Sequence, residues 1–151
     1  MSANTHTLTV QWNGGHGVEA PNPTGATARF GSLHELAALS AIELVQAGLA
    51  GFNGSEVVHV LAKKQQILSV LEIRVQGKRA TGPRSACTSI QLEYLLRGSG
   101  RTERGVAEAL SLSRHKCCSV AVMLDKTAEI QTSFRIRNEQ GEDGPSGPEV
   151  A

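Results

Sequence analysis

Two adjacent cysteines follow a short basic segment, and their thiols are the most reactive groups that this sequence offers. The segment Arg114–Lys116 directly precedes Cys117 and Cys118. Nucleophilic chemistry at cysteine needs the thiolate, which nearby cations and a helix N-terminus both stabilise. Because Ser113 is typical of a helix N-cap, the pattern predicts a single reactive thiol at Cys118. A sulfenic acid formed there would condense with Cys117, with Cys87 or with an external thiol.

The same cysteines also have a purely structural interpretation, which the sequence leaves open. Free cysteine is among the most buried residue types, so Cys117 and Cys118 would then be small packing residues. Cys87 starts a predicted strand with the parity of Ser89 and Gln91, which favours an inert thiol without deep burial. A disulfide between the two adjacent cysteines would be strained.

Composition argues against several other kinds of partner and chemistry. The 151 residues carry 15 basic and 14 acidic side chains, a net charge of +1. No basic block stands out, which argues against nucleic acid or an anionic membrane surface as the main partner. The longest apolar segment is too interrupted by polar residues to span a bilayer. None of the five histidines has the spacing of metal ligands and no Cys-x-x-Cys occurs, so we expect no metal and no cofactor.

The N-terminal residues do not have the pattern of an export signal. Three cysteines are then more consistent with reduced thiols than with disulfides. We therefore expect a cytoplasmic protein.

One long apolar segment, Ala41–Gln66, must position much of this chemistry and is predicted to be a central helix. Ser40 and Glu43 form a capping box at its start. Small residues crowd one stretch of it, between positions 47 and 54. Glycine inside a helix costs roughly 1 kcal/mol relative to alanine, so this stretch predicts the close approach of another backbone.

The remaining elements predict an α+β fold in which antiparallel sheets pack against two principal helices. Alternating polar and apolar residues indicate strands, and N-cap residues indicate two later helices. We expect one domain over residues 1–137, followed by a disordered Gly/Pro/acid-rich tail over residues 138–151. The predicted strands are Thr5–Trp12, Gly17–Ala20, Ala26–Phe30, Ser69–Arg79, Ala86–Arg97 and Ile130–Ile136, and the later helices are Thr102–Leu112 and Ser113–Lys126.

Four motifs together resemble the OsmC/Ohr family, the osmotically inducible and organic hydroperoxide resistance proteins. They are HTLTVQWNGG, ELVQAGLAGFNGSEVVHVLAKKQQ, the strand pair LEIRVQGKRA and IQLEYLLRG, and LSLSRHKCCSVAVML. The similarity extends from about Thr5 to Ile136. It implies an interlocked homodimer, in which two antiparallel sheets surround two main helices and the central helices lie buried between the sheets.

The resemblance also implies thiol chemistry at the dimer interface. In the family, a cysteine of the central helix is oxidised by a peroxide to sulfenic acid, a second cysteine condenses with it, and a dithiol opens the resulting disulfide. The attacking position is Phe52 in this chain, the partner position matches Cys118, and the tyrosine that precedes it is Cys117. A phenyl ring forms no thiolate.

Two further positions depart from the Ohr branch of the family. The arginine that follows the Gly-Gly turn there is His16 here, and the partner glutamate falls nearest Ile42, with Glu43 one residue away. Glu43 is most simply the N3 residue of its capping box. The lost cysteine and the lost arginine both indicate that the standard two-cysteine reaction does not run.

Phe52 therefore has two interpretations, a filler of the old active-site pocket or one wall of an apolar cleft. Three functions follow. The chain forms a homodimer without standard peroxidase activity that binds an apolar small molecule or an organic hydroperoxide. Alternatively it is a hydroperoxide reductase that uses Cys118 alone, or a structural partner of another OsmC-like subunit.

Overall fold

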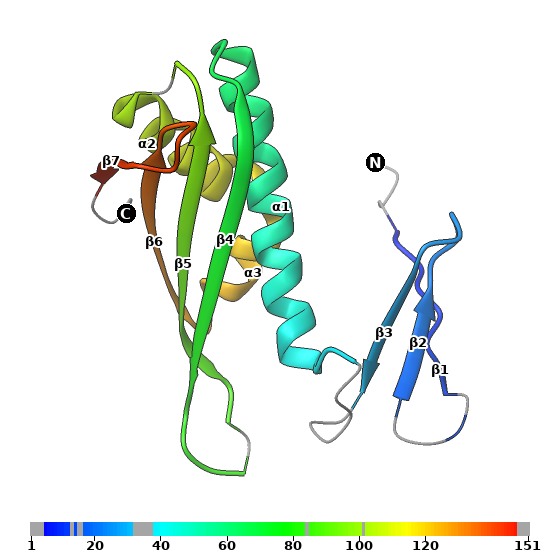
Figure 1. Cartoon of the computed structure of the whole chain (residues 1–151). Helices are drawn as coiled ribbons and strands as arrows, with labels where there is room; N and C mark the ends of the chain where they lie inside the picture. Colours follow the sequence, from blue (N-terminus) through cyan, green and yellow to red (C-terminus); the bar gives the residue numbers. More distant parts are fainter. Residues whose placement is uncertain are drawn as a thin grey trace. The chain divides into compact units, whose positions relative to one another are not determined.

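The computed structural model describes residues 5–12, 14, 17–31, 38–83, 85–100 and 102–147. The chain divides into two compact units, Met1–Val45 and Gln46–Ala151, and each is described by itself (Figure 1). Strands and helices occur together, as the predicted α+β class requires.

The first unit holds a three-stranded antiparallel meander, as predicted. Its strands are β1 (Gln11–Trp12), β2 (Gly17–Pro21) and β3 (Thr27–Gly31), in the order β1-β2-β3. The first strand is much shorter than the predicted Thr5–Trp12, because only its last two residues pair with β2. Its alternating apolar side chains, Leu8, Val10 and Trp12, are more than half exposed and do not form the expected buried face.

The second unit holds a four-stranded sheet. Its strands are β4 (Leu68–Arg79), β5 (Cys87–Gly98), β6 (Glu129–Arg137) and β7 (Asp143–Gly147), in that order. β4 and β5 form an antiparallel hairpin, but β5 and β6 are parallel. The expectation of antiparallel pairing throughout is wrong at this point. Helices connect β5 to β6, and such a crossover returns the chain in the same direction.

The C-terminal segment differs from the predicted disordered tail. Residues Asp143–Gly147 pair with β6 as an antiparallel strand. A tight turn precedes this strand, in which Gly141 has a φ of 85° and the Asn138 side chain accepts the Glu142 N–H at 2.8 Å. Main-chain hydrogen bonds hold β7, so a composition without apolar anchors did not prevent a strand. Residues 148–151 lie outside the described part of the chain.

Helices cover one face of this sheet (Figure 1). They are α1 (Ala41–Lys63), α2 (Glu103–Leu112), a π-helical turn η1 (Ser113–Cys117) and α3 (Ser119–Leu124). Thr102 caps α2 as predicted, because its hydroxyl accepts the Gly105 N–H at 3.0 Å. Among the helices that the structure describes, none combines the length and apolar character needed to cross a membrane.

The core lies between the helices and the inner faces of β5 and β6. Leu49, Val57 and Leu61 of α1 are fully buried there with Val106 of α2. The inner positions of β5 are equally buried, namely Ile90, Leu92, Tyr94 and Leu96. The alternation that predicted these strands therefore marks the core correctly.

The glycines of α1 differ in how closely other atoms of the chain approach them. A Cβ placed on Gly54 would lie 2.8 Å from Cδ1 of Ile73, so a side chain of β4, rather than the predicted second backbone, approaches the helix there. A Cβ placed on Gly48 or Gly51 would have no atom within 4 Å. Part of the small-residue stretch therefore lies open within the second unit.

Candidate functional site

A buried polar contact ties the π-helical turn to α1. The Ser113 hydroxyl lies 3.0 Å from the main-chain oxygen of Asn53 and 3.0 Å from its Oδ1, and donates to these acceptors. Both residues are buried in an otherwise apolar core. Because buried polar groups keep their hydrogen bonds, this contact fixes the turn beside the α1 residue that follows Phe52.

The prediction that Ser113 caps a helix is wrong, because Cys118 caps α3 instead. Ser113 has helical backbone angles, and its hydroxyl is engaged with Asn53. Cys118 has the extended ψ of 100° that an N-cap needs, and its sulfur accepts the Ala121 N–H at 3.3 Å. The Cys118 N–H closes the π turn on the Ser113 carbonyl at 3.1 Å. Short π-helical segments occur frequently at functional sites.

Cys118 is buried, with only 2 % of its surface exposed. Its sulfur serves as a helix cap, and the side chain belongs to the core cluster. Water and solutes therefore do not reach this thiol in the folded chain. The arrangement agrees with the structural interpretation of Cys118.

Cys117, in contrast to Cys118, is exposed at the end of the π turn. Partial loss of water around its sulfur and, after that, the charge and hydrogen bond of Glu56 raise the pKa of the Cys117 thiol, while Lys116 opposes the shift. Glu56 lies one helical turn after Phe52 on α1. Cys117 thus lies near the face of α1 that carries Phe52, in surroundings that disfavour its thiolate.

Replacing Glu56 by glutamine is expected to make Cys117 more reactive at neutral pH. Without the carboxylate, the pKa of the Cys117 thiol falls, and the alkylation profile moves to lower pH because only the thiolate reacts. The rate of iodoacetamide labelling, followed by peptide mass spectrometry from pH 6.5 to 9.5, measures this. Glu103→Gln on α2 is the matched control and should leave the profile in place. A profile unchanged by Glu56→Gln would show that Glu56 does not act on this thiol.

Replacing Ser113 by alanine is expected to destabilise the fold by about 1–3 kcal/mol, because Asn53 then keeps a buried oxygen without its donor. Urea unfolding followed by circular dichroism measures the loss. Ser119→Ala, at an exposed position of α3, is the control and should change stability by less than about 0.5 kcal/mol. Equal effects of the two substitutions would contradict the role given to Ser113.

Phe52 lies on α1 with 39 % of its surface exposed. A ring this exposed does not act as a core filler within the second unit. An apolar groove of about 400 Å³ runs along the same helix, between α1 and β4. Its lining residues are Ala50, Gly51, Gly54, Ser55, Val58, Leu71 and Ile73.

The remaining residues singled out from sequence are Glu43, Cys87 and His16. Glu43 is in the first unit, where its carboxylate accepts the Ser40 N–H at 2.7 Å and the predicted capping box is confirmed. Cys87 is half-buried at the start of β5, beside a bulge. His16 falls outside the described residues. In the part of the chain that is described, no three His, Cys, Asp or Glu side chains are grouped so that they could hold a metal ion.

Several residues of the site were not anticipated from the sequence. Asn53 and Glu56 are polar positions within an apolar helix, and that interruption was the available signal. Tyr94 is buried on β5, and burial raises the pKa of its phenol, with smaller and opposed effects from Cys118 and Arg114. No local pattern links Tyr94 to the cysteines, because only the sheet brings them into one neighbourhood.

A family model described as OsmC-like protein matches residues 33–133. The chain is also 31% identical over 97 residues to the protein YhfA of Escherichia coli strain K12, an alignment that covers 64% of this chain and 72% of the relative.

Solved structures share the fold. The OsmC-like protein of Mycoplasma pneumoniae superposes with a TM-score of 0.76 at 16% identity, over 89% of this chain and 98% of that one. An organic hydroperoxide resistance protein OsmC from Legionella pneumophila superposes with a TM-score of 0.60 at 15% identity, over 85% and 96% of the two chains. At these identities the structures establish the fold alone. The family model and the relative identify the chain as a member of the OsmC-like protein family.

Proposed function

We propose that this protein is a homodimeric OsmC-family member that does not catalyse the two-cysteine reduction of organic hydroperoxides and instead binds an apolar small molecule beside Phe52. The observation that carries the proposal is the side chain at position 52. The resemblance to the family places the attacking cysteine there, and a phenyl ring has no thiol to attack a peroxide.

Neither remaining thiol near this position replaces the missing nucleophile. Cys118 is 2 % exposed and caps α3 through its sulfur. Cys117 is exposed, but its raised thiol pKa leaves little thiolate at neutral pH. A reductase that uses Cys118 as its only reactive thiol is therefore the less favoured function. All three cysteines are free thiols, which is consistent with the reducing cytoplasm that we propose as its location.

The exposed apolar side chains support a dimer. Phe52 and Val58 on α1, and Val122 and Met123 on α3, are between 39 % and 67 % exposed. Apolar surface of this kind typically marks an interaction site. A second copy would cover the open stretch of α1 around Gly51, because a twofold axis presents the same patch from both subunits. Exposed apolar side chains of the first unit, those of Leu8, Val10 and Trp12, need a cover for the same reason.

The groove along α1 supports the choice of ligand. Its volume of about 400 Å³ falls in the range of small-molecule sites, and its lining is mainly aliphatic. The exposed ring of Phe52 lies on the same helix and would add an apolar wall. The lining includes no acid, base or thiol, and its one hydroxyl, that of Ser55, donates to the Phe52 carbonyl oxygen at 2.9 Å. No lining residue could activate that hydroxyl, so the lining is suited to holding a ligand.

An assay of the purified protein tests the first part of the proposal. With cumene hydroperoxide and a dithiol, we expect peroxide consumption no faster than in the protein-free control. Turnover above that background, lost on mutation of Cys118 to serine, would overturn the proposal in favour of the single-thiol reductase.

Titration with cumyl alcohol, an apolar probe without a peroxide bond, tests the second part. We expect saturable binding by calorimetry that Val58→Glu weakens at least tenfold, because the variant places a charge in the groove. Ala62→Glu, at an exposed position near the end of the same helix, is the matched control and should bind as the unmodified protein does. Binding that is equal in both variants would place the ligand elsewhere.

A further inference from the structure

We propose that the outward face of the β4–β6 sheet binds a small oxyanion, such as a phosphate or carboxylate group, through a cluster of three arginines. The cluster is formed by Arg74 of β4 and by Arg135 and Arg137 of β6, and Arg97 of β5 lies beside it. It lies on the face of the sheet opposite the helices, and the proposal does not depend on the function proposed above.

Strand register brings these side chains together. Tyr94 and Leu96 point into the core, so residues of odd number on β5 point outward. Arg97 lies directly opposite Arg137 in the parallel β5–β6 pair, and Arg135 follows two residues earlier on the same face. Like charges directly opposite each other destabilise a sheet. This arrangement therefore favours a negative partner between the strands.

The protein's own carboxylates satisfy only part of the cluster. Arg135 pairs with Glu93 at 3.4 Å, and Arg137 pairs with Asp143 at 2.9 Å. Among the described residues no acid pairs with Arg74 or Arg97. The neighbouring Arg97 does not line the depression described below, and its Nε is buried without a hydrogen-bond acceptor among the described residues. It adds positive charge beside the cluster.

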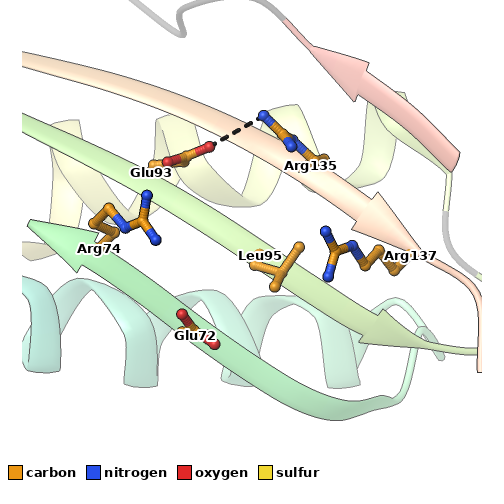
Figure 2. A pocket seen from close by; sticks show the side chains of 6 residues that line it. All are labelled: Glu72, Arg74, Glu93, Leu95, Arg135 and Arg137. Atoms are coloured by element: carbon orange, nitrogen blue, oxygen red, sulfur yellow. Dashed lines mark hydrogen bonds and ion pairs between the residues drawn. The ribbon is translucent and has the colours of Figure 1, made fainter. Parts of the chain in front are cut away.

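A small depression lies between Arg74, Arg135 and Arg137 (Figure 2). Its volume is about 120 Å³, and it is lined by Glu72, Arg74, Glu93, Leu95, Arg135 and Arg137. Figure 2 shows Leu95 at its centre, with the guanidinium of Arg137 on one side and that of Arg74 on the other. The space suits a single compact ion and is too small for a cofactor.

Guanidinium groups favour ligands with two adjacent acceptor oxygens, because the planar fork of donors matches carboxylate and phosphate oxygens. Leu95 gives the depression a floor that does not compete for these oxygens. Glu93 is engaged with Arg135, which holds that guanidinium in place. Glu72 has no ion-pair partner in the described chain, so its charge opposes an anion and limits affinity. The affinity of the site for an anion therefore depends on the balance between the attraction of the arginines and the repulsion of Glu72.

Calorimetric titration of the unmodified protein with inorganic phosphate, and separately with malonate, at pH 7.5 and low ionic strength tests the inference. We expect saturable binding of at least one of the two anions. Arg74→Gln should weaken it about tenfold, the effect of losing one charge-assisted contact. Glu72→Gln should tighten it severalfold. Arg104→Gln, which removes a highly exposed arginine of α2, should leave it unchanged.

The outcomes separate the possibilities. Saturation by phosphate alone assigns a tetrahedral anion, and saturation by malonate assigns a carboxylate ligand; either supports the inference when the three variants behave as expected. Absence of saturable heat with both anions overturns it. Equal weakening by Arg74→Gln and Arg104→Gln also overturns it, because binding would then follow net charge alone. Circular dichroism of each variant establishes that the fold is retained.

Discussion

Replacing Phe52 by cysteine is expected to give this protein the organic hydroperoxide reductase activity that, as proposed above, the unmodified chain lacks. The new thiolate would attack the peroxide oxygen and release an alcohol, leaving a sulfenic acid on the sulfur. A second protein thiol would then form a disulfide and release water, and a dithiol would reduce the disulfide. Position 52 is accessible, with 39 % of the present side chain exposed, so a peroxide can reach it.

The expected second thiol is Cys118. The hydrogen bond between Ser113 and Asn53 holds the turn that leads to Cys118 against the α1 residue beside position 52. The pH dependence should be steep, because the resemblance to the family puts His16 where the Ohr branch has an arginine, and Glu56 lies one turn away from position 52. We expect the rate to rise roughly tenfold for each pH unit below the thiol pKa, which is near 8.5 for an unperturbed cysteine.

The gained activity is measured as the rate at which the variant consumes cumene hydroperoxide in the presence of a dithiol, from pH 6.5 to 9. Phe52→Ser is the matched control, because it removes the ring without adding a thiol, and it should stay at background. Adding Cys118→Ser to Phe52→Cys should abolish turnover, whereas adding Cys117→Ser should leave most of it. If Phe52→Cys forms neither a sulfenic acid nor a disulfide, Phe52 does not account for the missing activity.

Replacing Gly51 by arginine is expected to convert the proposed dimer into monomers. A side chain at position 51 meets no atom within 4 Å in the single chain, and arginine favours a helix over glycine by about 1 kcal/mol. The variant should therefore fold. In the dimer, the same charge would be buried against an apolar surface, a cost of about 3–5 kcal/mol, so dissociation should increase on the order of a hundredfold or more.

Analytical ultracentrifugation over a range of concentrations measures the change. Ala62→Arg places the same charge at an exposed position near the end of α1 and should leave the dimer intact. Gly54→Ala provides a second comparison, because its Cβ would meet Ile73 within the same chain and should reduce stability without dissociating the dimer. A dimer that tolerates Gly51→Arg would place the interface on another surface.

The sequence by itself determined the elements whose signals are local. The Ser40–Glu43 capping box and the Thr102 N-cap each join atoms three residues apart. The alternation from Ile90 to Leu96 correctly marked the inner face of β5. Motifs in the right order also identified the family. Each of these signals lies within one helical turn, one strand or one short motif, so it does not depend on contacts between distant parts of the chain.

Only the tertiary structure decided how distant parts of the chain pair. Ser113 has the side chain of an N-cap, but its hydroxyl binds Asn53, sixty residues away, and Cys118 takes over the cap. The parallel pairing of β5 with β6 depends on the path of the intervening helices. β7 forms because β6 offers free main-chain groups, although its own sequence favours disorder. A side chain or strand that has several possible partners pairs with the one that the fold brings within hydrogen-bond distance. Local sequence patterns do not show which partner that is.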